Sequence, residues 1–484
     1  MEKGLKSLTY TGVIWSFIER FSYQLIQFVI SIIMARILDP GDYGLIGLLA
    51  IFMALSQVFI DGGFSSALIQ SKENTDKDFA TVFYINLAIS ILLYGLLFVS
   101  APAIASFYHQ PSLKQITRVY TTTLIISSLS AVHSTKLVIN VDFKTQSIIS
   151  VSSAIISGCI GIFLAIKGFG VWALVIQSIV GTSIGCLMKY LLVRWIPKSG
   201  FSKSSFNRLF SFGSKLLIAQ IISTIYDNIY SLFIGKRFST RTLGFYTRGN
   251  QFNNLVSVNI SDIMNRVSFP VLSRVQDDNT RLLEIYSKYI KMSVFIMFPM
   301  VLGLCGVAKP LITFLLTEKW LPCVPLLQIL CFAFLFNGVT KINLNLLYVK
   351  GRSDLVLRLE IIKKCIGFTI LVITVFFDIK IVCFGQVIYS WVALFLNTFY
   401  TKRILGFGFY EQIKSIIPYL SLSLIVLAES LAISSFVEPS WLSLIISLVV
   451  CSATYLGLSK YFSLYAFGEV FSTAKNYLIR MKHQ

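Results

Sequence analysis

Apolar runs of membrane-spanning length follow one another along almost the whole chain. A transmembrane helix needs about 20 predominantly apolar residues, and about 14 such segments can be drawn between breaks made by Pro, Gly or clusters of charge. They are 11–37, 43–66, 80–104, 117–138, 147–166, 169–193, 209–235, 243–268, 292–315, 323–348, 359–377, 381–401, 415–435 and 441–459. Because residues 243–268 are unusually polar for a span, counts of twelve and thirteen stay open. The runs predict an all-α integral membrane protein.

The composition indicates the same class. Of the 484 residues, 55% are hydrophobic and 13% are charged, and the mean hydropathy is +0.76. Soluble domains are about a quarter charged, so these values exclude a soluble globular enzyme and a disordered chain. The first apolar run is far longer than the core of a signal peptide, and we expect it to be retained as the first span.

The net charge of +20 would suggest nucleic acid as the partner of a soluble protein. In a membrane protein, basic residues gather in the short cytoplasmic loops, so we expect no nucleic-acid partner. If the N-terminus is inside, the cytoplasmic connections carry 23 Lys and Arg and the opposite connections carry 7. Both termini are therefore predicted to be cytoplasmic.

A faint internal repeat appears when the sequence is shifted by 200 residues. The shift places Gly44 on Gly244 and Arg36 on Lys236. Spans one to six and seven to twelve then form two halves, and an even number of helices per half gives parallel repeats with a cavity between the lobes.

This repeat predicts the domain organisation. Two pseudo-symmetric six-helix lobes enclose a central cavity and are followed by two additional helices. The expected boundaries are an N-terminal lobe at 1–193, a cytoplasmic linker at 194–208, a C-terminal lobe at 209–403, two more transmembrane helices at 404–459 and a cytoplasmic amphipathic tail at 460–484.

The sequence contains no motif for covalent chemistry in a fitting context. It lacks a GxxxxGK[ST] phosphate loop and HExxH, and its GxSxG match at 181–185 lies in the middle of an apolar run and not at a turn between a strand and a helix. We therefore expect no ATP hydrolysis and no enzymatic activity. The eight cysteines form no CxxC pair and the three histidines are scattered. We therefore expect no cofactor and no metal site.

Polar residues inside the spans are the candidates for function, because ionisable groups in a membrane are costly. The segment 243–268 carries the largest set. Polar residues recur along one helical face at steps of 4, 3, 4 and 4; they are Asn250, Asn254, Ser257, Ser261 and Asn265. Further polar or charged residues lie beside this face; they are Arg248, Gln251, Asp262 and Arg266. This face predicts a helix that lines water; the alternative is an interfacial helix lying flat on the membrane.

Arginine is the side chain that best matches the geometry of phosphate. Arg20, Arg248 and Arg266 would give a water-filled cavity a positive potential, which suits an anionic substrate. Asp262 lies one turn before Arg266 and is predicted to hold that guanidinium when the site is empty. The candidate substrate-binding residues are Arg20, Arg248, Asn250, Asn254, Asp262 and Arg266.

Three acidic residues inside spans are candidates for coupling or gating: Glu19, Asp61 and Asp227. Glu19 lies beside Arg20 in the first span, and Asp61 lies just before two glycines where a helix can loosen. A contact from an acid to Arg20 could serve transport, or could be a buried ion pair that only fixes helix packing.

Several stretches of the sequence are similar to the polysaccharide transporters of the multidrug, oligosaccharidyl-lipid and polysaccharide flippase superfamily. The likeness runs from the first to the twelfth span, weakens over 405–484, and is strongest for the lipopolysaccharide, O-antigen and colanic-acid branch. It rests on ARILDPGDYGLIGLLAIF (35–52), FIDGGFSSALIQ (59–70), GFGVWALVIQ (168–177), LGFYTRGNQFNNL (243–255), VSFPVLSRVQDD (267–278), EKWLPCVPLLQIL (318–330) and KGRSDLVLRLEIIKK (350–364).

The resemblance implies a flippase that moves an undecaprenyl-pyrophosphate-linked oligosaccharide to the periplasmic leaflet of the bacterial inner membrane. It implies alternating access, with membrane lipids and other polysaccharide assembly proteins as partners. Members often carry a proline followed by basic residues where this chain has His133, Ile139 and Asn140, while Lys136 lies slightly earlier. A multidrug exporter of the same architecture and a polytopic polymerase or ligase of the envelope remain alternatives.

Overall fold

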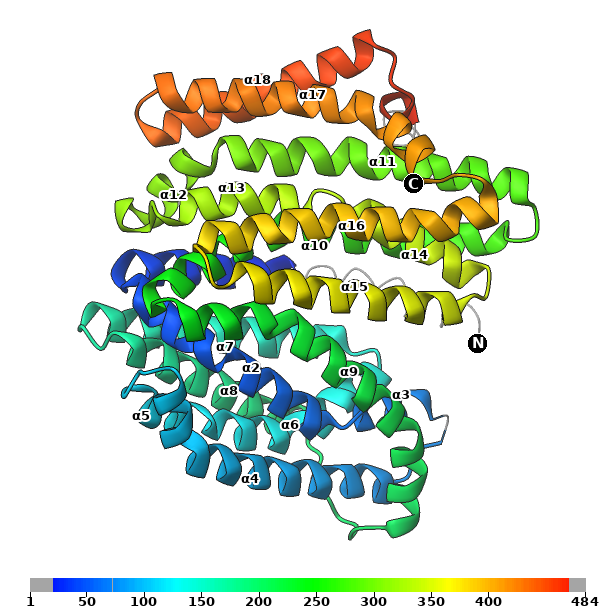
Figure 1. The fold of residues 1–484 in the computed structure, drawn as a ribbon. Coiled ribbons are helices and arrows are strands. Elements are labelled where there is room, and N and C mark those ends of the chain that lie inside the picture. Colours follow the sequence, from blue (N-terminus) through cyan, green and yellow to red (C-terminus); the bar gives the residue numbers. More distant parts are fainter. Residues whose placement is uncertain (1–20, 72, 470–484) are drawn as a thin grey trace, which may run out of the picture. The chain divides into compact units, whose positions relative to one another are not determined.

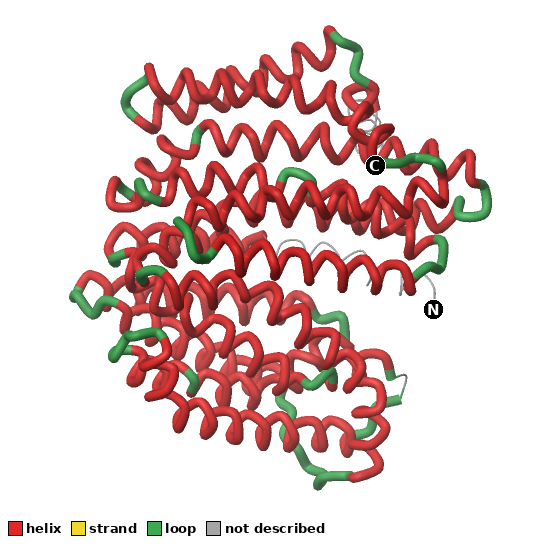
Figure 2. The backbone as a smooth tube through the Cα atoms, viewed as in Figure 1, coloured by secondary structure: helices red, strands yellow, loops and turns green. Residues whose placement is uncertain are grey.

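The computed structural model describes residues 21–71 and 73–469. Within these residues the chain is helical, with short loops and no strand (Figure 2). The chain divides into two compact units, Met1–Gly244 and Phe245–Gln484. The prediction of an all-α membrane protein is confirmed for the part of the chain that the structure describes.

The first unit contains a helix at Phe21–Ile37 and eight labelled helices (Figure 1). They are α2 (Pro40–Asp61), α3 (Phe64–Gln70), α4 (Asp76–Phe107), α5 (Leu113–Tyr120), α6 (Thr122–Ile139), α7 (Phe143–Ile166), α8 (Val171–Val193) and α9 (Lys203–Arg237). The helix α10 (Thr240–Arg274) begins at the end of this unit. Because α9 packs on α2 and α3, the compact unit extends beyond the expected lobe border at 194–208, and the division into six-helix lobes stays a prediction.

Local sequence signals begin and end these helices. Asp39 accepts a hydrogen bond from the Gly41 amide, and the Asp42 carboxylate accepts one from the Asp39 amide. This capping box satisfies backbone donors that have no partner inside the helix. At the other end of α2, Gly62 takes a left-handed conformation with φ 54°, which glycine adopts without strain.

The second unit contains the remainder of α10 and the helices that follow it. They are α11 (Asn279–Gly306), α12 (Ala308–Leu316), η1 (Glu318–Trp320), α13 (Cys323–Phe334), α14 (Asn337–Val349), α15 (Ser353–Thr374), α16 (Ile379–Leu405), α17 (Phe409–Phe436) and α18 (Ser440–Tyr461).

Two predicted spans in this unit are not single helices. The segment 292–315 breaks between α11 and α12 at Val307, because the ring of Pro310 clashes with the carbonyl four residues earlier, at Gly306. The segment 323–348 breaks between α13 and α14 at Leu335 and Phe336. There the Phe336 ring is buried, 4.7 Å from the ring centroid of Trp391.

In the described residues, eleven helical segments are long and apolar enough to cross a membrane, and Phe21–Ile37 is a shorter apolar helix. The helices α10 and α15 are not among the eleven, and both carry several charged residues. The chain is therefore a multi-pass membrane protein, and the count of fourteen spans stays a prediction.

The repeat-related glycines lie at a close contact between α2 and the first turn of α10, within the first unit. A Cβ atom on Gly44 would lie 1.8 Å from the Thr240 carbonyl oxygen, and one on Gly244 would lie 1.9 Å from the Pro40 carbonyl oxygen. Thr240 and Pro40 are themselves counterparts under the 200-residue shift. The contact is therefore reciprocal, as expected at an axis that relates two repeats.

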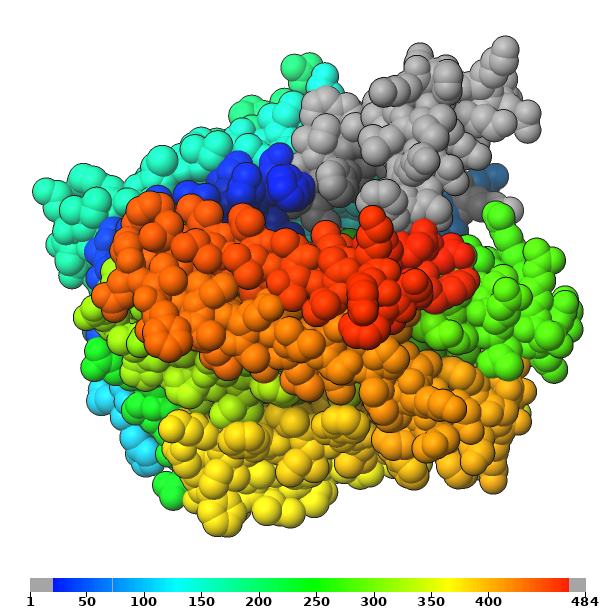
Figure 3. All heavy atoms as spheres, turned by 90° about the horizontal axis from the view of Figure 1, so that it is seen from above, coloured from blue at the N-terminus to red at the C-terminus, as the bar shows by residue number. Residues whose placement is uncertain are grey.

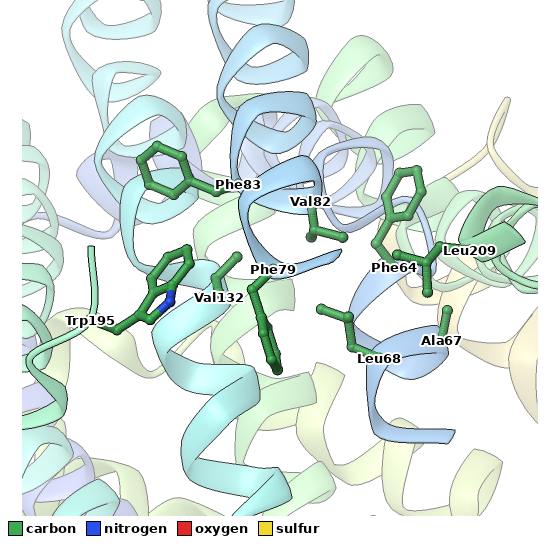
Figure 4. Packing of buried hydrophobic residues seen from close by; sticks show 9 residues of the cluster. All are labelled: Phe64, Ala67, Leu68, Phe79, Val82, Phe83, Val132, Trp195 and Leu209. Atoms are coloured by element: carbon green, nitrogen blue, oxygen red, sulfur yellow. The ribbon is translucent and has the colours of Figure 1, made fainter. Parts of the chain in front are cut away.

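An apolar cluster in the first unit packs the segment after α8 against α3, α4, α6 and α9 (Figure 4). Its buried members are Phe64, Ala67, Leu68, Phe79, Val82, Phe83, Val132, Trp195 and Leu209. The Trp195 indole also donates to the Asp76 carboxylate at 2.9 Å. The start of the expected linker is thus fixed to the first turn of α4.

Candidate functional site

The first unit contains a partly open cavity of about 780 Å³ whose wall is rich in hydroxyl groups. The wall comes from the helix Phe21–Ile37 and from α2, α3, α6, α7 and α8. The lining hydroxyl side chains of serine and threonine are Ser65, Ser127, Ser130, Ser134, Thr135, Ser150, Ser153, Ser157, Ser178 and Thr182, and the lining amides are Gln27, Gln57 and Gln177. A polar cavity of this size inside a bundle of apolar helices is the candidate site.

Helical periodicity brings these residues to one place. On α6 and α7, serines recur at steps of 3 and 4, which keeps them on one face of each helix; they are Ser127, Ser130 and Ser134, then Ser150, Ser153 and Ser157. On α8 the corresponding face carries Gln177, Gly181, Gly185 and Lys189. The small glycines leave room for the cavity beside the polar side chains.

Most hydroxyl groups of the wall donate a hydrogen bond to a backbone carbonyl of their own helix. Ser134 donates to the Ser130 carbonyl at 3.3 Å, and Ser153 donates to the Ser150 carbonyl at 3.1 Å. Thr182 donates to the Ser178 carbonyl at 2.8 Å. Because a hydroxyl oxygen keeps its two lone pairs when it donates, the wall mainly offers acceptors. It suits a ligand that carries many O–H or N–H donors.

Two of the described residues that line this cavity are charged, and their charges are opposite. Lys189 donates to the Ser130 hydroxyl at 3.3 Å. Asp61 lies at the end of α2. Among the described residues that line the cavity, one ammonium therefore balances one carboxylate. The basic lumen that the arginines predict stays a prediction.

The chain bends immediately after Asp61. Gly62 and Gly63 have φ of 54° and 74°. A Cβ atom on Gly63 would lie 2.4 Å from the Gly213 carbonyl oxygen on α9. The elbow beside the cavity carboxylate therefore packs backbone to backbone against α9, and only glycine fits there.

On α10, Arg248 lies inside the second unit and is 4% exposed. Its guanidinium lies 5.3 Å from the ring centroid of Trp320 and donates to the Gln251 side chain at 2.8 Å. Asn250 and Asn254, predicted as its neighbours on a water-lined face, are half-buried. The structure therefore places Arg248 in a packed environment, and its binding role stays a prediction.

The predicted contact between Asp262 and Arg266 is corrected by the structure. The Asp262 carboxylate accepts a hydrogen bond from the Lys341 ammonium on α14. Residue spacing within α10 could not predict a partner on another helix. Arg266 is exposed. Ser257 and Ser261, expected to face water, are fully buried and donate to carbonyls of the preceding turn.

The remaining predicted site residues are Asp227, Glu19, Arg20 and Asp61. Asp227 is exposed on α9 and accepts from Ser223 at 3.4 Å. Glu19 and Arg20 lie outside the described residues. Of the predicted acids and bases that are described, Asp61 lines the cavity of the first unit.

His133 and Lys136 lie where the sequence differs from the pattern of the family that it resembles. Both side chains contact the segment after α8. The His133 ring nitrogen Nε2 lies 2.9 Å from the Trp195 carbonyl oxygen. The Lys136 ammonium lies 4.4 Å from the ring centroid of Phe79 and 5.0 Å from that of Trp195. These two side chains anchor the linker.

Comparison with known proteins identifies the class of membrane protein to which this fold belongs. The fold matches that of the lipid II flippase MurJ in its inward closed conformation, with a TM-score of 0.73, 18% identity, and coverage of 93% of this chain and 98% of that one. The chain is therefore a multi-pass membrane protein with a MurJ-like fold. A family model described as "Polysaccharide biosynthesis protein" matches residues 33–325, and the chain belongs to this family.

Two relatives extend the match along the sequence. The chain is 27% identical over 350 residues to the teichuronic acid biosynthesis protein TuaB of Bacillus subtilis (strain 168), covering 71% of this chain and 72% of that protein. It is 24% identical over 439 residues to the lipopolysaccharide biosynthesis protein WzxC of Escherichia coli (strain K12), covering 89% and 88%. The resemblance inferred from the sequence stretches is confirmed.

Proposed function

We propose that this protein moves a lipid-linked oligosaccharide across the bacterial cytoplasmic membrane for the synthesis of a surface polysaccharide. The carrier would be undecaprenyl pyrophosphate, and the protein would work by alternating access without enzymatic activity. The observation that carries the proposal is the hydroxyl-lined cavity of about 780 Å³ within the membrane-spanning helices.

The cavity addresses the physical obstacle to this transport. Each unpaired hydroxyl taken from water into an apolar medium costs several kcal/mol (roughly 2–7), and a sugar carries several. A wall of acceptor oxygens replaces the lost hydration, while the polyprenyl chain stays in lipid. The volume lies within the range of about 300–1,000 Å³ that is common for ligand sites, which fits a few sugar units.

The relatives support this choice of substrate. TuaB and WzxC are named for the biosynthesis of teichuronic acid and lipopolysaccharide, and MurJ is named a lipid II flippase. Teichuronic acid and lipopolysaccharide contain long sugar chains, which a cell must build from precursors too polar to cross hydrocarbon unaided.

Within this proposal the named residues have different roles. Asp61, the carboxylate of the cavity wall, acts in coupling or gating, as does Asp227. Arg248 and Arg266 meet the pyrophosphate, with Asn250, Asn254 and Asp262 as polar contacts. Both termini lie on the cytoplasmic side, as the distribution of Lys and Arg indicates.

A pair of variants on one helix tests the proposal. Ser153 lines the cavity, whereas Cys159 on the same helix α7 is exposed on its outer surface. Ser153→Leu removes an acceptor that would pair with a hydroxyl group of the bound sugar. Leaving that hydroxyl unpaired costs about 1–3 kcal/mol, so we expect export of surface polysaccharide to fall by roughly tenfold. Cys159→Leu should leave export unchanged.

The readout is a leaflet-resolved measurement of lipid-linked sugars in cells that express equal amounts of each variant. We expect Ser153→Leu to accumulate the precursor in the cytoplasmic leaflet. Normal precursor distribution combined with increased sensitivity to cationic drugs would instead support a multidrug exporter.

A further inference from the structure

A second cavity, of about 500 Å³, lies in the second unit between α11, the first turns of α17 and the segment that follows α18. Its wall combines two lysines with three tyrosines: Lys291, Lys414, Tyr410, Tyr419 and Tyr465. The charge distribution of the sequence predicts that this end of the helices faces the cytoplasm. Lysine and tyrosine together are typical of the headgroup level of a membrane.

The segment after α18 is fixed in position and so forms a defined wall. The Ala466 amide donates to the Tyr419 hydroxyl at 3.4 Å. Lys288 on α11 forms an ion pair with Glu469 at 2.6 Å, and this hydrogen bond holds the pKa of Glu469 below its ordinary value. Figure 3 shows α17 and α18, in orange to red, running side by side in this unit.

The positive charge of the wall has no acidic partner within the described part of the chain. Lys291 lies 5.5 Å from the ring centroid of Tyr465 and forms no ion pair there, and neither does Lys414. Glu411 also lines the cavity, but its carboxylate accepts from the Gly408 amide at the start of α17. Two ammonium groups are thus available to an anion.

An apolar stripe begins at this cavity and continues along α17. Exposed side chains recur every seven residues, which keeps them on one face of the helix; they are Tyr410, Ile417, Leu424 and Leu431. Lys414 lies on the same side, between the first two. From residue 410 to residue 431 the helix rises about 32 Å at 1.5 Å per residue, about the thickness of the hydrocarbon core.

We propose that this cavity binds the phosphate group of an anionic membrane phospholipid, with Lys291 and Lys414 as its charged contacts and the acyl chains along the α17 stripe. Basic pockets between membrane helices recognise such headgroups. The chain's own C-terminal segment is a poor occupant, because residues 470–484 contain Lys475, Arg480 and Lys482 and no acid. The stripe favours a lipid over free phosphate.

The test uses the full-length protein, purified in a non-ionic detergent and exposed to equal amounts of phosphatidylglycerol and phosphatidylcholine. Native mass spectrometry counts the lipids that remain bound. Lys291→Gln with Lys414→Gln should lower retention of phosphatidylglycerol on the order of tenfold, since each lysine near a membrane surface contributes a factor of a few. Retention of phosphatidylcholine should not change.

The matched control is Lys402→Gln with Lys460→Gln, which removes the same charge from exposed positions outside the cavity. We expect this pair to retain phosphatidylglycerol as the unaltered protein does. The proposal is overturned if both pairs lose the lipid equally, if neither does, or if inorganic phosphate displaces the lipid at equal concentration. Should the first pair fail to fold, Lys414→Gln alone gives the same comparison against Lys402→Gln.

Discussion

A substitution of Arg266 can distinguish a contact with the substrate from a role in helix packing. Its guanidinium is exposed, and the neighbouring Asp262 bonds to Lys341 instead. A surface substitution without packing contacts changes stability by about 0.5 kcal/mol or less. Arg266→Ala should therefore leave the melting temperature and the membrane abundance unchanged while it reduces polysaccharide export.

Arg266→Lys should restore export in part, because it keeps the charge but loses the bidentate geometry. Arg274→Ala, at an exposed position in the last turn of the same helix, is the control and should export normally. Normal export by Arg266→Ala would contradict a role in binding pyrophosphate.

The residues of the cavity show why sequence analysis found the charged candidates and missed the hydroxyl wall. Asp61 stood out because a carboxylate in an apolar run is costly. Serines such as Ser134 and Ser153 did not, because each donates to the carbonyl of its own helix and so enters a membrane at little cost. Their spacing at steps of 3 and 4 on consecutive helices was the available signal.

At the level of helices, a buried hydrogen-bond network joins α11, α14, α16 and α17. Gln412 donates to the Tyr286 hydroxyl at 2.9 Å and to the Thr401 hydroxyl at 3.3 Å, and it accepts from Asn343 at 3.2 Å. All four side chains are fully buried. The network fixes α17, which carries Lys414 of the proposed lipid site, to α11, α14 and α16.

Gln412→Leu should destabilise the protein by about 1–3 kcal/mol, the usual cost of leaving buried polar partners unsatisfied. The measurement is the thermal unfolding midpoint of the purified protein in detergent. Ser421→Leu, at an exposed position on the same helix, is the control and should unfold at the same temperature as the unaltered chain. An unchanged midpoint for Gln412→Leu would mean that water replaces the lost partners.

Helix boundaries were predictable to different degrees. The break at Val307 precedes Pro310, whose ring clashes with the carbonyl of Gly306. The sequence offered a second candidate in the same segment, Pro299, which lies inside α11 without a break. The break at Leu335 and Phe336 has neither Pro nor Gly at its centre, and it accompanies the burial of Phe336 against Trp391. Such a break depends on contacts between helices, which no pattern within the segment 323–348 contains.

For the molecule as a whole, the 200-residue repeat predicts that equivalent positions respond alike to the same change. Gly44 and Gly244 are such a pair, and each meets the carbonyl oxygen four residues before the other glycine: Gly44 meets that of Thr240, and Gly244 meets that of Pro40. The shift alone predicted the pairing of the glycines but not their contact. The reciprocal approach favours glycine at both positions, since neither backbone can move away without loss of the other's packing.

Gly44→Ala and Gly244→Ala should each destabilise the protein, because a Cβ atom would lie under 2 Å from a backbone oxygen in both and overpacking typically costs about 1–3 kcal/mol. The two losses should be similar, and the double variant should lose less than their sum, because one displacement relieves both clashes. Gly95→Ala on α4 has no atom within 4 Å of its added Cβ and should be neutral or slightly stabilising. The measurement is the thermal unfolding midpoint of the four variants. If the two losses of stability add in full, or if only one of the glycine variants loses stability, the two contacts are independent of each other. Either result would contradict a reciprocal contact between the repeats at this point.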